Sequence, residues 1–279
     1  MTGLTKAVFV SVAALAIGAA SAADLPTRKP PPVPTPVAEP SPWRFEVTGY
    51  GWASSLAGTS GFGGLPSLPY YASFGKVLEH LDGALMGSVL ARNGAYIVGL
   101  DMLWSRVGGS GTVRLSYGPF NAAGADLTLT EGIATAFGGV RIPIGPPNLE
   151  IYGTVGARYM YSGNKLTLNS PVPGFSASTS VNKDWVDPVA GFAAHYRFDD
   201  RWFVNVFGDL GGWSDSATGQ ALASVGYDWT RNWSTTLGYR VLYTYEKQDT
   251  GFNALTGADR SFRYQQWMYG PLIGVKYSF

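Results

Sequence analysis

Apolar and polar residues alternate with a period of two through most of the sequence from Trp43 to Phe279. This period is typical of β-strands, and no helical period persists beyond about two turns. The pattern predicts an all-β fold of ten strands, separated by residues that favour turns. The predicted strands are 43–56, 82–93, 95–107, 126–144, 149–162, 184–198, 201–213, 218–230, 232–247 and 261–279.

The connections between these strands alternate between tight turns and longer loops. Asn93-Gly94 is the clearest tight turn, because both central positions of a two-residue hairpin loop need a positive φ. The other tight turns are 145–148, 199–200 and 230–232, and the intervening connections are 57–81, 108–125, 163–183, a short one near 214–217, and 248–260. Short turns at one end and longer loops at the other predict a closed antiparallel transmembrane β-barrel. An even number of strands would place both termini at the short-turn, periplasmic end.

Composition favours a lipid environment for this barrel. Only 14% of the residues are charged and 46% are hydrophobic, whereas soluble domains carry about 25% charged residues. The longest apolar run, 8–20, is shorter than the roughly 20 residues of a spanning helix. The chain has no cysteine and two histidines, so a cysteine nucleophile and a thiolate or multi-histidine metal site are not expected. A formal net charge of +1 gives no reason for a nucleic-acid partner. We predict no cofactor.

The N-terminal region is predicted to contain two segments before the barrel. Residues 1–22 have the pattern of a secretory signal peptide: Lys6, an apolar stretch, and small residues that end at Ala22. Residues 23–42 are rich in proline, which favours an extended, semi-rigid conformation, and are interpreted as a periplasmic linker. A peptide-binding role for this linker is the alternative. Residues 43–279 form the predicted outer-membrane barrel.

Successive positions along each strand point to opposite faces of the barrel wall. One alternate set is apolar and predicts the outer surface, and the other set predicts a lumen lined by small and charged residues. The inward acids and bases are nearly balanced, which predicts ion pairs rather than a selectivity ring of one sign. Barrels of about eight strands are filled by side chains, so ten strands predict a mostly closed lumen. The predicted lumen charge network consists of Glu46, Arg92, Asp101, Glu131, Arg141, Glu150, Arg158, Asp187, Arg197, Asp209, Asp228, Arg240, Glu246 and Lys276.

Tryptophans near the ends of strands predict two aromatic girdles, where amphipathic rings favour the membrane–water interfaces. From Tyr269 to Phe279 a tilted strand advances about 25 Å along the membrane normal, which is the height of the apolar band in such barrels. Trp202, Trp229 and Trp233 are expected at the periplasmic level, and Trp104, Trp185, Trp213 and Trp267 at the outer level. A carbohydrate-binding surface is the alternative explanation of these tryptophans.

The chain resembles the small outer-membrane β-barrel proteins of Gram-negative bacteria, which include the OmpA-like and porin-like barrels. The resemblance rests on the signal peptide, on the Ala-Asp-Leu-Pro start, which looks like alphaproteobacterial surface barrels, and on the C-terminal alternation. It implies that Ile273, Val275, Tyr277 and Phe279 form the signal read by the barrel-assembly machinery. It also implies outer-membrane lipid and lipopolysaccharide as partners. The best-known small members have eight strands, which is the alternative to the ten predicted here.

These features predict a role in envelope structure or surface interaction, with at most narrow permeation of small solutes. A narrow, porin-like channel is one alternative. Another is a barrel hydrolase, acting on protein or lipid A, that would use the rim around His80, where Glu79 and Asp82 lie nearby. Apolar residues at Phe74, Val77, Leu78 and Leu81 predict a short amphipathic helix beside this histidine. No catalytic residue and no extracellular ligand is identified, and an enzyme is not expected.

Overall fold

The computed structural model describes residues 43–62, 68–113, 123–169, 176–248 and 262–279. The predicted signal peptide and linker lie outside these residues, so the boundaries after Ala22 and after Pro42 stay predictions. No helix in the described ranges is long and apolar enough to cross a membrane.

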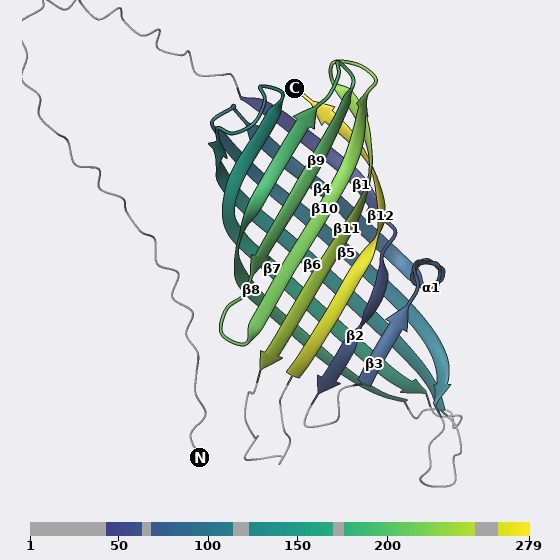
Figure 1. The fold of residues 1–279 in the computed structure, drawn as a ribbon. Helices are drawn as coiled ribbons and strands as arrows, with labels where there is room; N and C mark the ends of the chain where they lie inside the picture. Colours follow the sequence, from purple (N-terminus) through teal and green to yellow (C-terminus); the bar gives the residue numbers. More distant parts are fainter. Residues whose placement is uncertain (1–42, 63–67, 114–122, 170–175, 249–261) are drawn as a thin grey trace, which may run out of the picture. The chain divides into compact units, whose positions relative to one another are not determined.

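Within these residues the chain forms one antiparallel sheet of twelve strands and one short helix, α1 (Figure 1). The elements are β1 (Arg44–Trp52), β2 (Ser55–Phe62), β3 (Leu68–Ala72), α1 (Phe74–Glu79), β4 (Leu81–Arg92), β5 (Tyr96–Val113), β6 (Ala123–Ile142), β7 (Leu149–Asn169), β8 (Ser176–Arg197), β9 (Trp202–Gly211), β10 (Ser216–Asp228), β11 (Trp233–Gln248) and β12 (Phe262–Ser278). Ten of them, β1 and β4 to β12, form a closed barrel, and β2 and β3 are additional. The all-β prediction and the ten-stranded barrel are confirmed.

The barrel closes between its first and last strands. β1 pairs with β12 from Glu46 opposite Ser278 to Trp52 opposite Leu272. At the end of this seam the backbone N–H of Phe45 donates to the carbonyl of Phe279 at 3.0 Å, and the reciprocal bond is 2.9 Å. The two phenyl rings stack with centroids 5.7 Å apart. Closure gives the backbone groups of both terminal strands a partner along this seam, which a membrane barrel requires.

The predicted first strand, 43–56, is divided in two by the structure. After β1 the backbone N–H of Ser54 donates to the carbonyl of Trp52, which breaks the regular ladder. β2 then continues along the other half of β12, and β3 folds back against β2. The expected loop 57–81 therefore contains a hairpin and α1. Small residues dominate β2, so its alternation is too weak to be recognised as a strand.

Strands β5 to β8 are longer at the long-loop end than the sequence predicts. β5 continues to Val113, β6 starts at Ala123, and β7 and β8 together pair over 149–169 and 176–196. Polar residues predominate in these extensions, where apolar alternation, the signal of a lipid-facing strand, is weak. We call this the long-loop end, and the opposite end, with the connections 93–95, 143–148, 198–201 and 229–232, the short-turn end.

Side chains hydrogen-bond the backbone in several short turns. At Asn93-Gly94, Gly94 has a φ of 77°, and the side-chain oxygen of Asn93 accepts the N–H groups of Ala95 and Tyr96. In another such turn the Oδ1 of Asp199 accepts the N–H groups of Arg201 and Trp202 at 2.7 and 2.6 Å. These bonds replace missing ladder bonds and hold each hairpin register.

The Asp199 turn predicts a pH-dependent contribution to stability. The backbone N–H groups of Trp202 and Arg201 hold the pKa of the Asp199 carboxyl below its usual value of 3.8. Because folding lowers this pKa, the carboxylate stabilises the folded state at pH values above its usual pKa. This contribution is lost as the pH falls through the lowered pKa. The wild type should therefore unfold at a higher temperature than Asp199→Asn at neutral pH, with a smaller difference in acid. An equal difference at both pH values would contradict this account.

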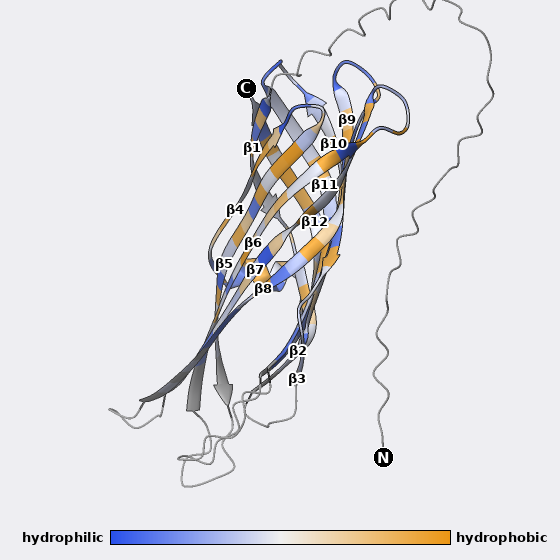
Figure 2. Ribbon diagram, turned by 90° about the vertical axis from the view of Figure 1, so that its left-hand side faces the viewer, coloured by the Kyte–Doolittle hydropathy of each residue, from blue (hydrophilic) through white to orange (hydrophobic). Residues whose placement is uncertain are grey.

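Hydrophobic and hydrophilic residues alternate along the barrel strands (Figure 2). The exposed apolar side chains point outward from the strands, among them Leu210 at 75% and Val155 at 69% exposure. Burial alternates most regularly in β12, where every second residue from Tyr264 to Lys276 is buried inside the barrel. The outside of the barrel is therefore an apolar surface that water would solvate poorly.

Candidate functional site in the barrel lumen

The middle of the lumen is crossed by a hydrogen-bonded network built around two arginines. Arg158 in β7 is fully buried, and its Nη2 contacts both carboxylate oxygens of Asp209 in β9 at 2.7 Å. Its other nitrogens donate to the hydroxyls of Thr135 and Thr218 at 3.0 and 2.7 Å. A buried guanidinium requires such partners, because an unpaired charge in this setting is costly.

Arg240 in β11 forms the second half of this network. Its Nη2 lies 2.9 Å from Oδ1 of Asp101 in β5, and its Nη1 donates to the Tyr50 hydroxyl at 2.9 Å. Tyr50 donates in turn to Asp101. Gln220 joins the two halves, since its Oε1 accepts from Arg240 and its Nε2 donates to Asp209 at 2.9 Å. Side chains from seven strands thus form one continuous polar layer across the barrel.

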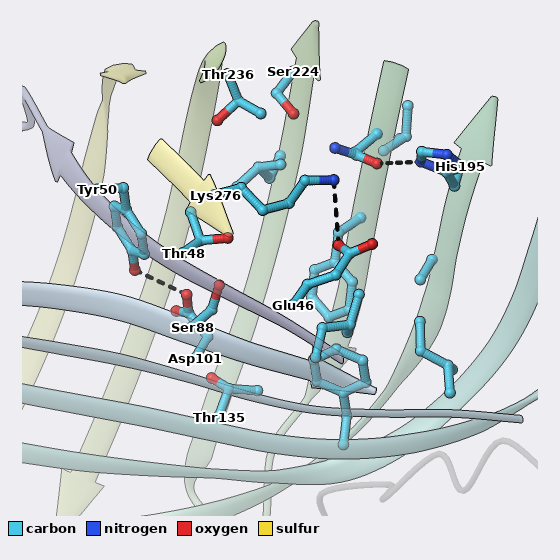
Figure 3. A pocket seen from close by; sticks show the side chains of 18 of the residues that line it. Glu46, Thr48, Tyr50, Ser88, Asp101, Thr135, His195, Ser224, Thr236 and Lys276 are labelled. Carbon is cyan, nitrogen blue, oxygen red and sulfur yellow. Dashed lines mark hydrogen bonds and ion pairs between the residues drawn. The ribbon is translucent and has the colours of Figure 1, made fainter. Parts of the chain in front are cut away.

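A second charged group lies toward the short-turn end. Arg92 in β4 bridges Glu46 at 2.8 Å and Glu150 at 3.0 Å, and Lys276 in β12 lies 3.4 Å from Glu46. Nearby, Nδ1 of His195 lies 2.8 Å from the side-chain oxygen of Asn205. Figure 3 shows the Lys276–Glu46 and His195–Asn205 contacts facing a common space. This space is a cavity of about 200 Å³ between the charged group and the central network.

The remaining predicted lumen charges also lie at inward-facing positions of their strands. Arg197 pairs with Asp228 at 2.8 Å, and Arg141 donates to the carbonyl of Leu149 at 3.3 Å. Asp187 accepts a hydrogen bond from the Ser216 hydroxyl. Glu131 is held by neutral donors, the Tyr264 hydroxyl and the Gln266 amide, both at 2.8 Å. Glu246 is buried in β11.

An apolar layer, which the sequence analysis missed, lies next to the central network on its long-loop side. Leu103, Met160 and Leu242 follow the network residues Asp101, Arg158 and Arg240 by two positions, and Ile133, in a strand of opposite direction, precedes Thr135 by two. The layer contains Trp52, Leu103, Ile133, Met160, Trp185, Leu242 and Met268. The expectation of a lumen lined only by small and charged residues is therefore wrong. Apolar side chains also fill this cross-section, because a narrow barrel must be packed.

The assignment of Trp185 to the outer aromatic girdle is wrong. Its side chain is 9% exposed and packs inside the barrel, with its ring 6.0 Å from that of Tyr264 in an edge-to-face arrangement. Trp185 lies two residues before Asp187 and therefore points to the same face of the strand, which is the inside of the barrel. The alternation thus already indicated an inward position for Trp185. This indication was hidden because Val186, on the opposite face, is apolar as well, as happens where a strand is covered by apolar groups on both faces.

The other predicted girdle tryptophans are on the outer surface. Trp104, Trp202, Trp213, Trp229, Trp233 and Trp267 all expose large parts of their rings. At the short-turn end these rings contact neighbouring aromatics: Tyr227 makes edge-to-face contacts with Trp202 at 5.0 Å and with Trp229 at 4.8 Å. Ile273, Val275, Tyr277 and Phe279 point outward from β12 and its end.

His80 lies at the end of α1, on the long-loop side of β4. Its Nδ1 is 2.9 Å from the backbone carbonyl of Lys76. The neighbouring acids are engaged with bases, Glu79 with Lys76 at 2.7 Å and Asp82 with Arg106 at 3.4 Å. The described ranges contain no group of three or more His, Cys, Asp or Glu residues that could hold a metal ion.

These observations define a closed antiparallel β-barrel whose lumen is crossed by a polar layer and an apolar layer. No protein-family model matches the sequence, and no curated protein matches it. Among solved structures, the chain is similar to the outer membrane protease OmpT from Escherichia coli, with 12% identity, a TM-score of 0.56, and coverage of 85% of this chain and 97% of that one. At this identity the likeness shows a shared fold and nothing about activity.

Two further solved barrels align over most of their length. The translocator domain of the autotransporter NalP from Neisseria meningitidis has 13% identity, a TM-score of 0.38, and coverage of 84% of this chain and 88% of that one. Ail, the attachment invasion locus protein of Yersinia pestis, has 14% identity, a TM-score of 0.30, and coverage of 86% and 99%. The closed ten-stranded barrel, together with the likeness to OmpT, shows that the chain has the fold of the small outer-membrane barrels.

Proposed function

We propose that this chain is an integral outer-membrane β-barrel with a role in envelope structure or surface interaction, and that its lumen is blocked. The observation that carries the proposal is the pair of stacked layers in the lumen: the Arg158–Asp209 and Arg240–Asp101 network, and the apolar layer beside it. Open aqueous channels occur in barrels with many more strands. The apolar outer surface supports placement in lipid.

Orientation, partners and assembly are part of this proposal. The short-turn end, which carries the C-terminus, would face the periplasm, because outer-membrane barrels have short periplasmic turns and longer extracellular loops. Outer-membrane lipid and lipopolysaccharide would contact the exposed tryptophans. The alternating outward residues at the end of β12, from Ile273 to Phe279, fit the assembly signal that the family resemblance implies, and the same segment closes the barrel on β1.

A blocked lumen predicts that the wild-type protein does not conduct ions. Incorporated into planar bilayers, it should give no reproducible single-channel steps. Removing part of the apolar layer with Leu242→Ala and Trp185→Ala should allow small steps, because water can then reach the central network. Insertion is verified by protection of the strands from protease in vesicles. The cavity between Arg92 and Arg240 makes a narrow selective channel the second candidate; a reproducible wild-type conductance that changes in Lys276→Gln would favour it.

A further inference from the structure

The barrel wall is incomplete next to α1. β1 and β4 pair only from Arg44 opposite Arg92 to Gly49 opposite Gly87. Beyond this point β1 continues along β12, and the first half of β4 is paired only with β5. β3 ends the sheet, with β2 on one side. We call the resulting gap the β3–β4 notch; it is bounded by β3, by residues 50–52 of β1 and by residues 81–86 of β4.

Backbone groups face this notch without the ladder bonds found elsewhere in the wall. Hydrogen-bonding direction alternates along an antiparallel strand. Since Phe45 and Ala53 bond to β12, Trp52 directs its backbone toward β4. Ala84 likewise directs its backbone away from β5. In the described part of the chain neither residue is paired with the opposite strand, and the Trp52 carbonyl instead accepts the N–H of Ser54. Open strand edges in contact with hydrocarbon alone are costly, so the notch needs a polar as well as an apolar occupant.

The notch opens onto the apolar outer surface. Leu85 of β4 is 73% exposed and lies opposite Trp104, and Tyr71 of β3 is 68% exposed. The floor of the notch, at Gly87, is two residues below Leu85, which corresponds to about 5 Å along the membrane normal. Exposed Phe74 and Leu78 in α1 extend the same apolar surface at the side of the barrel beside β3 (Figure 1).

The interior behind the notch is also apolar. Met86 of β4, Tyr50 of β1 and Leu56 of β2 all pack against the apolar layer of the lumen, which includes Trp52. Ala84 points inward like Met86, yet it is exposed, and it lies in the part of β4 that is not paired with β1. Apolar side chains therefore lie on both sides of the notch, with Leu85 on the outer surface and Met86 packed against the apolar layer inside.

We propose that the β3–β4 notch binds a membrane lipid, with one acyl chain passing between β3 and β4 to contact Met86 and the apolar layer. The lipid headgroup lies at the level of α1, beside the edges of β3 and β4, which in the described part of the chain are not paired with each other. Continuity with the lipid-facing surface identifies the occupant as a lipid. This inference rests on the proposed membrane location of the barrel.

Photolabelling by a lipid tests this proposal. The mature chain is reconstituted in phosphatidylcholine vesicles that contain a phosphatidylcholine with a diazirine near the end of one acyl chain, irradiated, and mapped by mass spectrometry. We expect label on outward-facing Val89 and also on inward-facing Ala84 and Met86 beside the notch. Ser88 is the matched control, because it faces inward at the level where β4 is paired with Thr48 of β1, and it should remain unlabelled.

The possible results test the lipid site and the membrane location of the barrel separately. Label on Val89 without label on Ala84 or Met86 overturns the lipid site and leaves the membrane barrel intact. Absence of label on Val89 refutes the membrane location, and the lipid site falls with it. Ala84→Trp should fill the notch and abolish label on Met86, whereas Val89→Trp should preserve it. A chemically crosslinked dimer that Ala84→Trp abolishes would show that a second copy occupies the notch, which also overturns the proposal.

Discussion

Replacing Arg158 with alanine should lower the free energy of unfolding by about 3–5 kcal/mol, the cost of leaving one member of a buried ion pair without its partner. The Asp209 carboxylate, which is as deeply buried as the arginine, would retain only the amide of Gln220. Thr135 and Thr218 would each lose a donor as well. The measurement is guanidinium unfolding of the protein folded in phospholipid vesicles.

Two variants separate the buried charge from a general effect of removing arginine. Arg106→Ala breaks a half-exposed pair with Asp82 and should cost about 1 kcal/mol or less. The double variant Arg158→Met, Asp209→Leu removes both charges and should recover a large part of the lost stability, because buried pairs are often replaceable by apolar side chains. Equal losses in Arg158→Ala and Arg106→Ala would show that the central network does not hold the barrel together.

An arginine in place of Leu237 should destabilise the barrel in lipid by about 2–4 kcal/mol, the cost of a charge at the bilayer midplane on the lipid face. Leu237 in β11 is 58% exposed and points outward. It lies four residues from Trp233 at the short-turn end, which is about 10 Å along the membrane normal and close to the middle of the apolar band. Unfolding in vesicles measures this cost.

The size of this effect distinguishes lipid from water around the barrel. On the surface of a soluble protein, the same substitution would change stability by about 0.5 kcal/mol or less. Pro147→Arg is the control, since Pro147 is exposed in a short turn beyond the strands and an arginine there should be nearly neutral. A Leu237→Arg protein that is as stable as wild type would contradict the membrane location.

Alternation in the sequence predicted ten barrel strands, most turns and the inward side of the charged residues of the lumen network, such as Arg158 and Asp209. This was possible because every second residue of a strand faces lipid and must be apolar, which leaves the polar residues at the positions between them. Trp185 shows where this reasoning fails. Near Trp185, both faces of the strand carry apolar residues. The alternation therefore no longer shows which residues face lipid and which face the packed lumen. The β2–β3 hairpin was missed for a different reason, since its small residues carry little alternation.

The class of fold, the faces of the strands and the inward charges could be predicted from the amino-acid sequence, because they follow from the period of two and from turn residues such as Asn93-Gly94. The folded barrel was needed to show which charges meet, such as Arg158 with Asp209, 51 positions away, and that an apolar layer crosses the lumen. It alone revealed the opening between β3 and β4. Contacts across the lumen and gaps in a wall depend on how strands are staggered around the barrel, and alternation within a single strand carries no information about that stagger.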